Sequence, residues 1–197
     1  MSKQSHSQVV NVDEVSSTDL SYGQRFQLTR KQLGMAAGAR KLGCTLVELP
    51  PGKRSWPLHY HAANEEAIYV LEGRGRVRIG DSEVPVRAGD YVALLSGPAG
   101  AHQTFNDSNS TLRYLCISTM IEPEVNFYPE SNRVGFFAGS APGGDREQRF
   151  LEGFVPFDAS VDYWAGEKSN REPVQHPIVA PLDRPILVLR TLVPKLK

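Results

Sequence analysis

The sequence predicts an all-β fold, a sandwich or a barrel, for the stretch between residues 50 and 120. Turn signals recur there roughly every eight to twelve residues, which is the spacing typical of such folds. The segment Arg74–Ile79 alternates, with Val77 and Ile79 on one face of a strand and arginines 74, 76 and 78 on the other. We expect the arginine face in solvent, because unpaired arginines are rarely buried. No segment of comparable length carries the apolar period of a helix.

Glycine- and proline-rich turns separate the expected strands. Two candidates, at 25–29 and 44–49, come before this region, and Gly34, Gly38 and Gly43 lie between or beside them. Each glycine disfavours a helix by about 1 kcal/mol, so the connector 29–42 is not expected to form a helix-turn-helix. The strands expected after the connector are 67–71, 74–79, 83–86, 91–95, 102–105 and 111–119.

The composition excludes partners that are held mainly by charge. The 197 residues include 22 Lys+Arg and 22 Asp+Glu, so the formal net charge is zero, and the basic residues are scattered. Nucleic acids and anionic membranes are bound by concentrated positive charge, so we expect neither as a partner. The two cysteines, Cys44 and Cys116, form no CxxC motif, and residues 1–10 lack the apolar core of a secretory signal. We expect a cytoplasmic protein whose thiols are reduced and pack as small apolar groups.

The distribution of residue types predicts three parts of the chain. Residues 1–22 are polar and cannot offset the entropy of ordering, so we expect a flexible arm. Residues 23–120 form the predicted β-barrel. Residues 121–197 are rich in Phe, Gly, Pro and Glu, and we expect them as an irregular extension that packs on the barrel or on a partner subunit, with one strand at 185–192.

Three of the five histidines fall in the predicted β region. His59 and His61 are two residues apart, so on a strand both imidazoles project from the same face, about 6 to 7 Å apart along the chain. Two rings on one face can reach the same metal ion. Glu66 lies just before the strand at 67–71, and His102 begins the segment 102–105. These residues supply three imidazoles and one carboxylate, whereas His6 and His176 lie outside the barrel and are given no role.

Two motifs, in the expected order, resemble those of the cupin superfamily. The string from Gly52 through His59-Tyr-His61 to Glu66 and Gly73 is similar to the first motif, and the string from Gly89 through His102 to Asn106 is similar to the second. The cupin spacing from Glu to Gly selects Glu66 rather than its neighbour Glu65. One residue more than usual separates Gly52 from His59. Either residues 95–97 or residues 98–100 take the place of the usual P-x-G turn before His102.

Roughly residues 30–167 resemble an uncharacterised subfamily of bacterial single-domain cupins. It implies a double-stranded β-helix, or jelly-roll barrel, with a metal ion in its mouth. The implied ligands are His59, His61, Glu66 and His102. Such ligands suit a divalent transition metal, Zn, Fe, Mn or Ni among them. Asn106 is expected either to orient a metal ligand or to bond its own backbone.

Three aromatic side chains lie near the expected ligands in the sequence. Tyr60 lies between the two histidines of the first motif and must point away from both. Trp56 and Tyr69 are expected either as walls of a pocket or as ordinary core residues.

The leading functional expectation is a metal-binding single-domain cupin that acts as an enzyme on a small polar organic molecule. Lewis-acid or oxygen-activating chemistry, as in isomerase or dioxygenase cupins, would suit the site. The competing expectation is a non-catalytic sensor that binds a small ligand. A third is a vestigial site in a barrel whose tail mediates assembly. Because cupins commonly pair through sheet edges and exchanged arms, we expect a homodimer.

Overall fold

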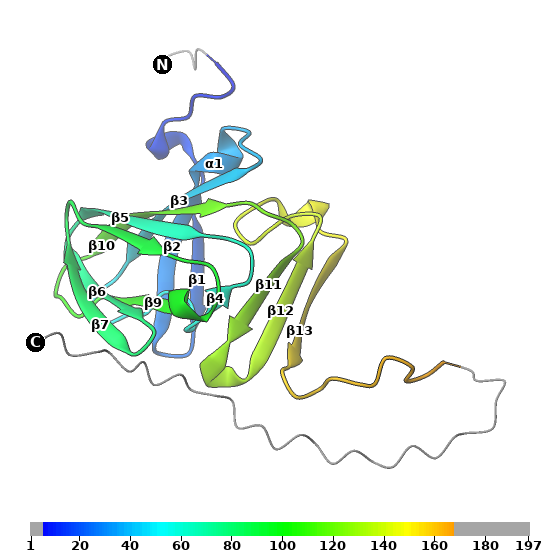
Figure 1. Ribbon diagram of the computed structural model, residues 1–197. Helices are drawn as coiled ribbons and strands as arrows, with labels where there is room; N and C mark the ends of the chain where they lie inside the picture. The colour runs from blue at the N-terminus through cyan, green and yellow to red at the C-terminus, as the bar shows by residue number, and fades with distance from the viewer. Residues whose placement is uncertain (1–5, 168–197) are drawn as a thin grey trace, which may run out of the picture. The chain divides into compact units, whose positions relative to one another are not determined.

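The structure is nearly all β, as the sequence predicts. The computed structural model describes residues 6–167 (Figure 1), and the strand expected at 185–192 and His176 lie outside that part of the chain. The strands are β1 (Thr18–Tyr22), β2 (Phe26–Gln32), β3 (Leu42–Leu49), β4 (Tyr60–His61), β5 (Glu66–Glu72), β6 (Arg74–Ile79), β7 (Ser82–Arg87), β8 (Tyr91–Leu94), β9 (His102–Phe105), β10 (Leu112–Thr119), β11 (Glu124–Tyr128), β12 (Arg133–Ala138) and β13 (Leu151–Pro156). The helical segments are α1 (Leu33–Ala36) and the 3-10 turns η1 (Val12–Glu14), η2 (Pro98–Gly100), η3 (Pro129–Ser131) and η4 (Arg146–Gln148). Among the described residues, no helix is long and apolar enough to cross a membrane.

These strands form three antiparallel sheets. The largest has the order β1-β2-β3-β10-β5-β8, the second β7-β6-β9 and the third β13-β12-β11-β4. Strand β10 lies between β3 and β5, so strands distant in the sequence pair at the centre of the largest sheet. Such crossed connections between antiparallel strands are typical of a jelly roll and not of a simple meander.

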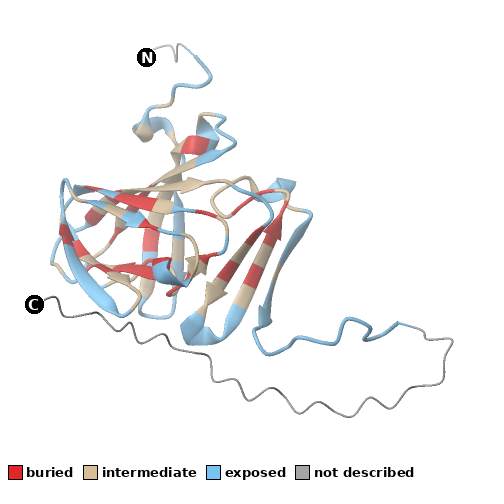
Figure 2. Cartoon of the chain, viewed as in Figure 1, coloured by how far each residue is buried: buried red, intermediate tan, exposed pale blue. Residues whose placement is uncertain are grey.

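The apolar core lies between the six-stranded and the three-stranded sheets. Leu28 (2% exposed), Val47 and Tyr114 from the first sheet pack in one cluster with Val77 (0% exposed) and Val86 from the second. Figure 2 shows the buried residues on the strands of these sheets, whereas β13 is largely exposed. Burying one such aliphatic side chain stabilises the fold by about 1.5 to 3 kcal/mol.

The alternation predicted for β6 is confirmed. Val77 is buried and Ile79 packs against the core, while Arg76 and Arg78 reach outward to form ion pairs with Asp107 and Glu130. On β7, Val86 is buried, whereas Val84, two residues earlier, is 43% exposed.

The inner face of the six-stranded sheet changes from apolar to polar along its strands. Tyr114 of β10 lies opposite Val70 of β5, and both are buried. Four residues further along β10, Ser118 lies opposite Glu66. Because side chains alternate along a strand, all four point to the same side of the sheet. The apolar half of this face therefore belongs to the core, and the polar half forms the wall of a cavity.

More of the chain belongs to the sheets than the sequence predicted. The last residues of the expected arm form β1, which pairs with β2 from Thr18↔Arg30 to Tyr22↔Phe26. Residues 124–156, expected in an irregular extension, form β11, β12 and β13. They are ordered by pairing, because β11 is hydrogen-bonded to β4, with Asn126 opposite His61. The expected boundary at residue 120 therefore falls inside the folded unit.

The chain divides into two units, residues 1–160 and 161–197. Within the described part of the second unit, the rings of Tyr163 and Trp164 meet edge to face at 4.7 Å between centroids. The expected homodimer stays a prediction.

Candidate metal centre

Four side chains converge where the polar half of the large sheet meets β4. They are His59, His61, Glu66 and His102, each of which offers one ligand atom, and these atoms all lie within 4.8 Å of one another. His59 precedes β4, His61 ends it, and Glu66 and His102 are the first residues of β5 and β9. The cluster predicted from the two motifs is thus assembled from the ends of three strands and one adjoining residue.

The backbones of His59 and His102 hold each other directly. The N–H of His102 donates to the carbonyl of His59 at 2.8 Å, and the N–H of His59 donates to the carbonyl of His102 at 3.2 Å. The two residues form an isolated antiparallel bridge, and their ring centroids are 4.5 Å apart. Residues from the two sequence motifs are therefore fixed side by side by main-chain hydrogen bonds.

Backbone carbonyls also set which ring nitrogen of these two histidines carries the proton. His59 Nδ1 lies 2.9 Å from the carbonyl of Pro57, and His102 Nδ1 lies 2.8 Å from the carbonyl of Gly100. A carbonyl only accepts, so each Nδ1 must be the donor. Each Nε2 then presents its lone pair, which is the form of histidine that binds a metal ion.

His61 completes the set in a different way. It is 4% exposed, and neither of its ring nitrogens has a hydrogen-bond partner. Its Nε2 lies 3.5 Å from Glu66 Oε2, while His102 Nε2 lies 3.1 Å from the same oxygen. A buried nitrogen without a partner costs about 1 to 3 kcal/mol, and a metal ion would remove that cost. The donor set of three imidazoles and one carboxylate fits a divalent transition metal.

The charges inside the cluster are strongly coupled. Burial, with the neighbouring imidazole of His102, lowers the pKa of His59 to about 3. Burial also acts to lower the pKa of His61, but the close approach and negative charge of Glu66 outweigh it, so the pKa of His61 is raised. For Glu66 burial acts to raise the pKa, yet the neighbouring imidazoles of His102 and His61 hold it well below its usual range. Glu66 is therefore a carboxylate at neutral pH.

A second buried carboxylate, which the sequence reasoning missed, supports the turn after His61. Glu124 is fully buried and accepts hydrogen bonds from the backbone N–H of residues 62, 63, 64 and 125 and from the side chain of Asn64. Its Oε2 lies 3.9 Å from His61 Nδ1. No signal in the sequence pointed to this role, because it depends on backbone N–H groups that the fold brings to Glu124.

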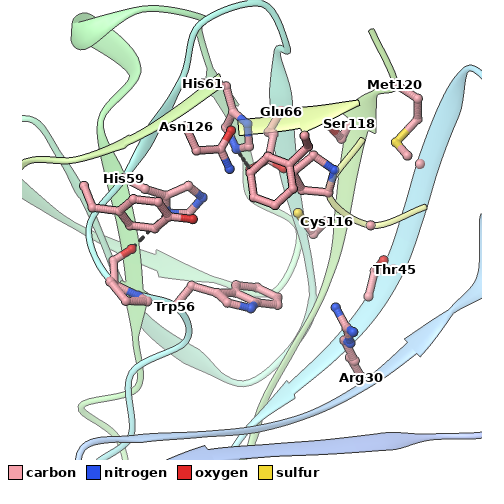
Figure 3. A pocket seen from close by; sticks show the side chains of 16 residues that line it. Arg30, Thr45, Trp56, His59, His61, Glu66, Cys116, Ser118, Met120 and Asn126 are labelled. Carbon is pink, nitrogen blue, oxygen red and sulfur yellow. Dashed lines mark hydrogen bonds and ion pairs between the residues drawn. The ribbon is translucent and has the colours of Figure 1, made fainter. Parts of the chain in front are cut away.

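A cavity of about 160 Å³ opens beside the cluster (Figure 3). His59, His61 and Glu66 form part of its wall, and Trp56 and Tyr128 line it as well. The rest of the lining comprises Arg30, Gly43, Thr45, Pro57, Cys116, Ser118, Met120, Asn126, Phe137, Pro142 and Gly143. The cavity is smaller than the roughly 300 to 1,000 Å³ typical of sites for drug-sized ligands, so a small metabolite suits it.

Several lining residues bear on the expectations made from the sequence. Trp56 is a pocket wall, which was one of its two expected places, whereas Tyr69 is 41% exposed on the outside of β5. Asn126 lies beside His61 in Figure 3, and this neighbour raises the pKa of His61. The buried Oδ1 of Asn126 makes no hydrogen bond of normal geometry. Sequence reasoning missed both Asn126 and Arg30.

Two other expectations are resolved by the contacts. The side chain of Asn106 forms hydrogen bonds with the backbone. Its Nδ2 donates to the carbonyls of Leu49 and Ser110, and its Oδ1 accepts from the N–H of Ser108. Tyr60 points away from the histidines that flank it, because its ring stacks on Phe127 at 4.8 Å.

The remodelled turn before His102 still aims that imidazole into the cluster. Gly97 has a φ of 80° and donates its N–H to the carbonyl of His61, and Pro98–Gly100 then form η2 directly before Ala101. Gly100 supplies the carbonyl that fixes the His102 ring. Residues 95–97 and residues 98–100 therefore both contribute to the turn that orients His102.

Comparison with known proteins agrees with this geometry. Residues 45–118 match the model of the family described as "Cupin domain". These residues are a cupin domain. The curated relatives include an "Oxalate-binding protein" of Thermotoga maritima, 33% identical over 75 residues, which is 38% of this chain and 60% of the relative. The chain spans 54% and 60% of the lengths of the first two curated relatives it matches.

Solved structures show the same fold around the cupin domain. A putative sugar phosphate isomerase of Acidithiobacillus ferrooxidans has a TM-score of 0.62 at 24% identity, covering 84% of this chain and 98% of that one. A sugar phosphate isomerase of Silicibacter pomeroyi has a TM-score of 0.64 at 24% identity, covering 77% of this chain and 94% of that one. The first of these likenesses extends well beyond residues 45–118, in keeping with the strands that the structure adds after β10.

Proposed function

We propose that the protein is a metal-dependent cupin enzyme that binds one divalent transition metal ion and acts on a small polar organic molecule in the adjoining cavity. His59, His61, Glu66 and His102 would hold the ion. The observation that carries the proposal is the convergence of their four ligand atoms within 4.8 Å, next to a cavity. The ion, when bound, supplies a Lewis acid that polarises an oxygen of the substrate or lowers the pKa of a water.

The residues of this chain have distinct parts in that function. The backbone carbonyls of Pro57 and Gly100 keep Nε2 of His59 and His102 unprotonated and directed at the cluster. Glu66 supplies a negative charge that offsets part of the charge of a divalent ion. Tyr128 stacks on His59, with 5.8 Å between ring centroids, and holds the ring against the cavity wall.

The curated relative named for oxalate binding supports a small oxygen-rich ligand. It also supports the second candidate, a binding protein without turnover. The two candidates share the metal centre and differ only in whether the bound ligand is converted.

The first experiment measures metal content per chain. Protein purified without chelator, and protein reconstituted with Zn, Fe, Mn or Ni, should carry about one ion per chain. His61→Ala should lose the ion, while the matched change His6→Ala, at an exposed histidine outside the cluster, should retain it. A wild-type protein that never reaches stoichiometric metal under any of these conditions would refute the site.

The second experiment tests catalysis with the metal-loaded protein. Conversion of small polar metabolites, with oxygen uptake recorded, should be found in the wild type and lost in Glu66→Gln. Saturable binding of a compound that is never converted would reject the enzyme and favour the binding protein.

A further inference from the structure

A positive charge that forms no ion pair within residues 6–167 lies in the same cavity as the candidate metal centre. Arg30 belongs to β2, where it shares a strand face with Leu28, a residue of the apolar core that is 2% exposed. It lies opposite Val47 of β3, which is fully buried. The strand geometry therefore directs Arg30 inward, and Figure 3 shows its guanidinium pointing into the pocket, near Thr45.

The surroundings of Arg30 do not neutralise it. Its Nε is buried and has no hydrogen-bond partner, and none of the ion pairs between residues 6 and 167 includes it. Burial and the positive charge of Arg149 lower the pKa of Arg30. A cation removed from water without a partner is costly, so such groups are normally paired or bind an anion.

The neighbouring arginine shows what a structural arginine does in this part of the fold. Arg149 donates to the carbonyls of Ser140 and Ala141 and pairs with Glu152. Its guanidinium is thus occupied by the loop that it holds, whereas Arg30 is left facing the cavity. The difference indicates that Arg30 serves a ligand and not the packing of the sheet.

We propose that the cavity binds a small organic anion, whose carboxylate or phosphate group pairs with Arg30 while its other polar end faces the metal centre. The contact with the metal centre in this proposal rests on the proposed function, whereas the contact with Arg30 does not. A guanidinium pairs with either oxyanion in a two-pronged hydrogen bond. Thr45 adds a hydroxyl to the wall near Arg30, and the cavity volume of about 160 Å³ limits the anion to a small one.

The binding experiment compares anions with neutral molecules of similar shape. Metal-loaded wild type is titrated calorimetrically with succinate against succinamide, and with glycerol 3-phosphate against glycerol. At least one anion should bind about tenfold or more tightly than its neutral counterpart. Whether succinate or glycerol 3-phosphate does so tells a carboxylate site from a phosphate site. Equal binding within both pairs, or no binding of either anion, would overturn the proposal.

Variants then test whether Arg30 itself is responsible. Arg30→Gln should weaken the anion by about tenfold to a hundredfold, and Arg30→Lys should restore part of the loss. Arg74→Gln, at an exposed arginine on the outer face of β6, should bind like the wild type. The metal content of Arg30→Gln should be unchanged. Unaltered anion affinity in Arg30→Gln would contradict the assignment.

A metal-free measurement separates this proposal from the proposed function. Phenylglyoxal modification of Arg30 is followed by mass spectrometry in chelator-treated protein, with and without the anion that binds. Protection of Arg30 in a protein that cannot be loaded with metal would support the anion site while the metal function fails. Full metal loading with no protection of Arg30, in either form of the protein, would overturn the anion site alone.

Discussion

Replacing Glu124 by Gln tests whether a buried carboxylate supports the turn after His61. In the wild type, Oε1 of Glu124 accepts from the N–H of Ala62 at 3.0 Å, of Ala63 at 3.4 Å and of Val125 at 2.9 Å. Oε2 accepts from the backbone N–H of Asn64 at 3.0 Å and from its side-chain amide. Gln keeps one oxygen, so the first group of bonds survives, but its NH₂ group then faces the two donors of Asn64.

The expected loss of stability comes from those two donors. Each buried donor without an acceptor costs about 1 to 3 kcal/mol, so Glu124→Gln should lower the free energy of unfolding by about 3 kcal/mol. Glu124→Ala removes every acceptor and should cost more. Urea denaturation of chelator-treated protein at pH 7.5 measures the change, and Glu65→Gln, at an exposed neighbouring site, is the matched control with an expected change below about 0.5 kcal/mol.

The same change should weaken metal binding. Glu124 Oε2 is 3.9 Å from His61 Nδ1, and the turn that Glu124 holds begins directly after His61. Loss of a group that supports a ligand typically weakens metal affinity by about tenfold to a hundredfold, and we expect a loss in that range. A Glu124→Gln protein within 1 kcal/mol of wild-type stability and with wild-type metal affinity would show that the buried carboxylate supports neither the turn nor His61.

Three further predictions concern the turn before His102, the buried His59 and the cavity thiol. Gly100→Ala should destabilise the protein by about 2 to 3 kcal/mol in thermal denaturation, because the added Cβ would collide with the carbonyl of Leu95. The control Ala99→Ser, at the exposed neighbouring residue, should be nearly neutral. Equal melting temperatures for the two variants would refute this prediction. The pKa of His59 is lowered to about 3, so between pH 6.5 and about 3 the unfolded chain binds this proton and the folded chain does not. Stability therefore falls with decreasing pH in this range by up to about 1.4 kcal/mol per unit. His59→Gln should therefore reduce the loss of stability of the metal-free protein between pH 6.5 and 5. The raised pKa of His61 acts in the opposite direction, but it does so in both the wild type and the variant. Parallel curves of stability against pH for the two proteins would contradict the burial of a neutral His59. Burial raises the pKa of the Cys116 thiol well above 9, so iodoacetamide at pH 8 should modify Cys116 at least about tenfold more slowly than a free cysteine, as read by mass spectrometry; rapid modification would contradict its place in the cavity wall.

The cupin motifs predicted which four side chains come together because their information is local. His59 and His61 share a face by strand parity, and the spacing to Gly73 selects Glu66 over Glu65. The strand 74–79 was predicted with the bounds that the structure has, because its alternation is clear and turn residues flank it. The ordered strands after residue 120 could not be predicted, because β11 gains its order from pairing with β4, more than sixty residues away.

The residues missed in the cavity were hidden for a different reason. Arg30 has the parity of Leu28, but only the register of β2 against β3 shows that the face they share is the inner one. Glu124 is an ordinary acidic residue in the sequence, and its role depends on four backbone N–H groups that the fold brings to it. A buried charge of this kind is recognised from its contacts, not from its neighbours in the chain.

The main-chain bridge between His59 and His102 bears on the order in which the protein is assembled. In small metal-dependent folds the ion organises the chain, and the apo form is unfolded. Here two candidate ligands are brought into place by peptide hydrogen bonds that need no ion, within a barrel that has its own apolar core. We therefore expect the chain to fold before any ion binds. A bound ion would then be selected by its supply in the cell as well as by the affinity order of the metals, and we expect the metal content of the protein to change with the growth medium.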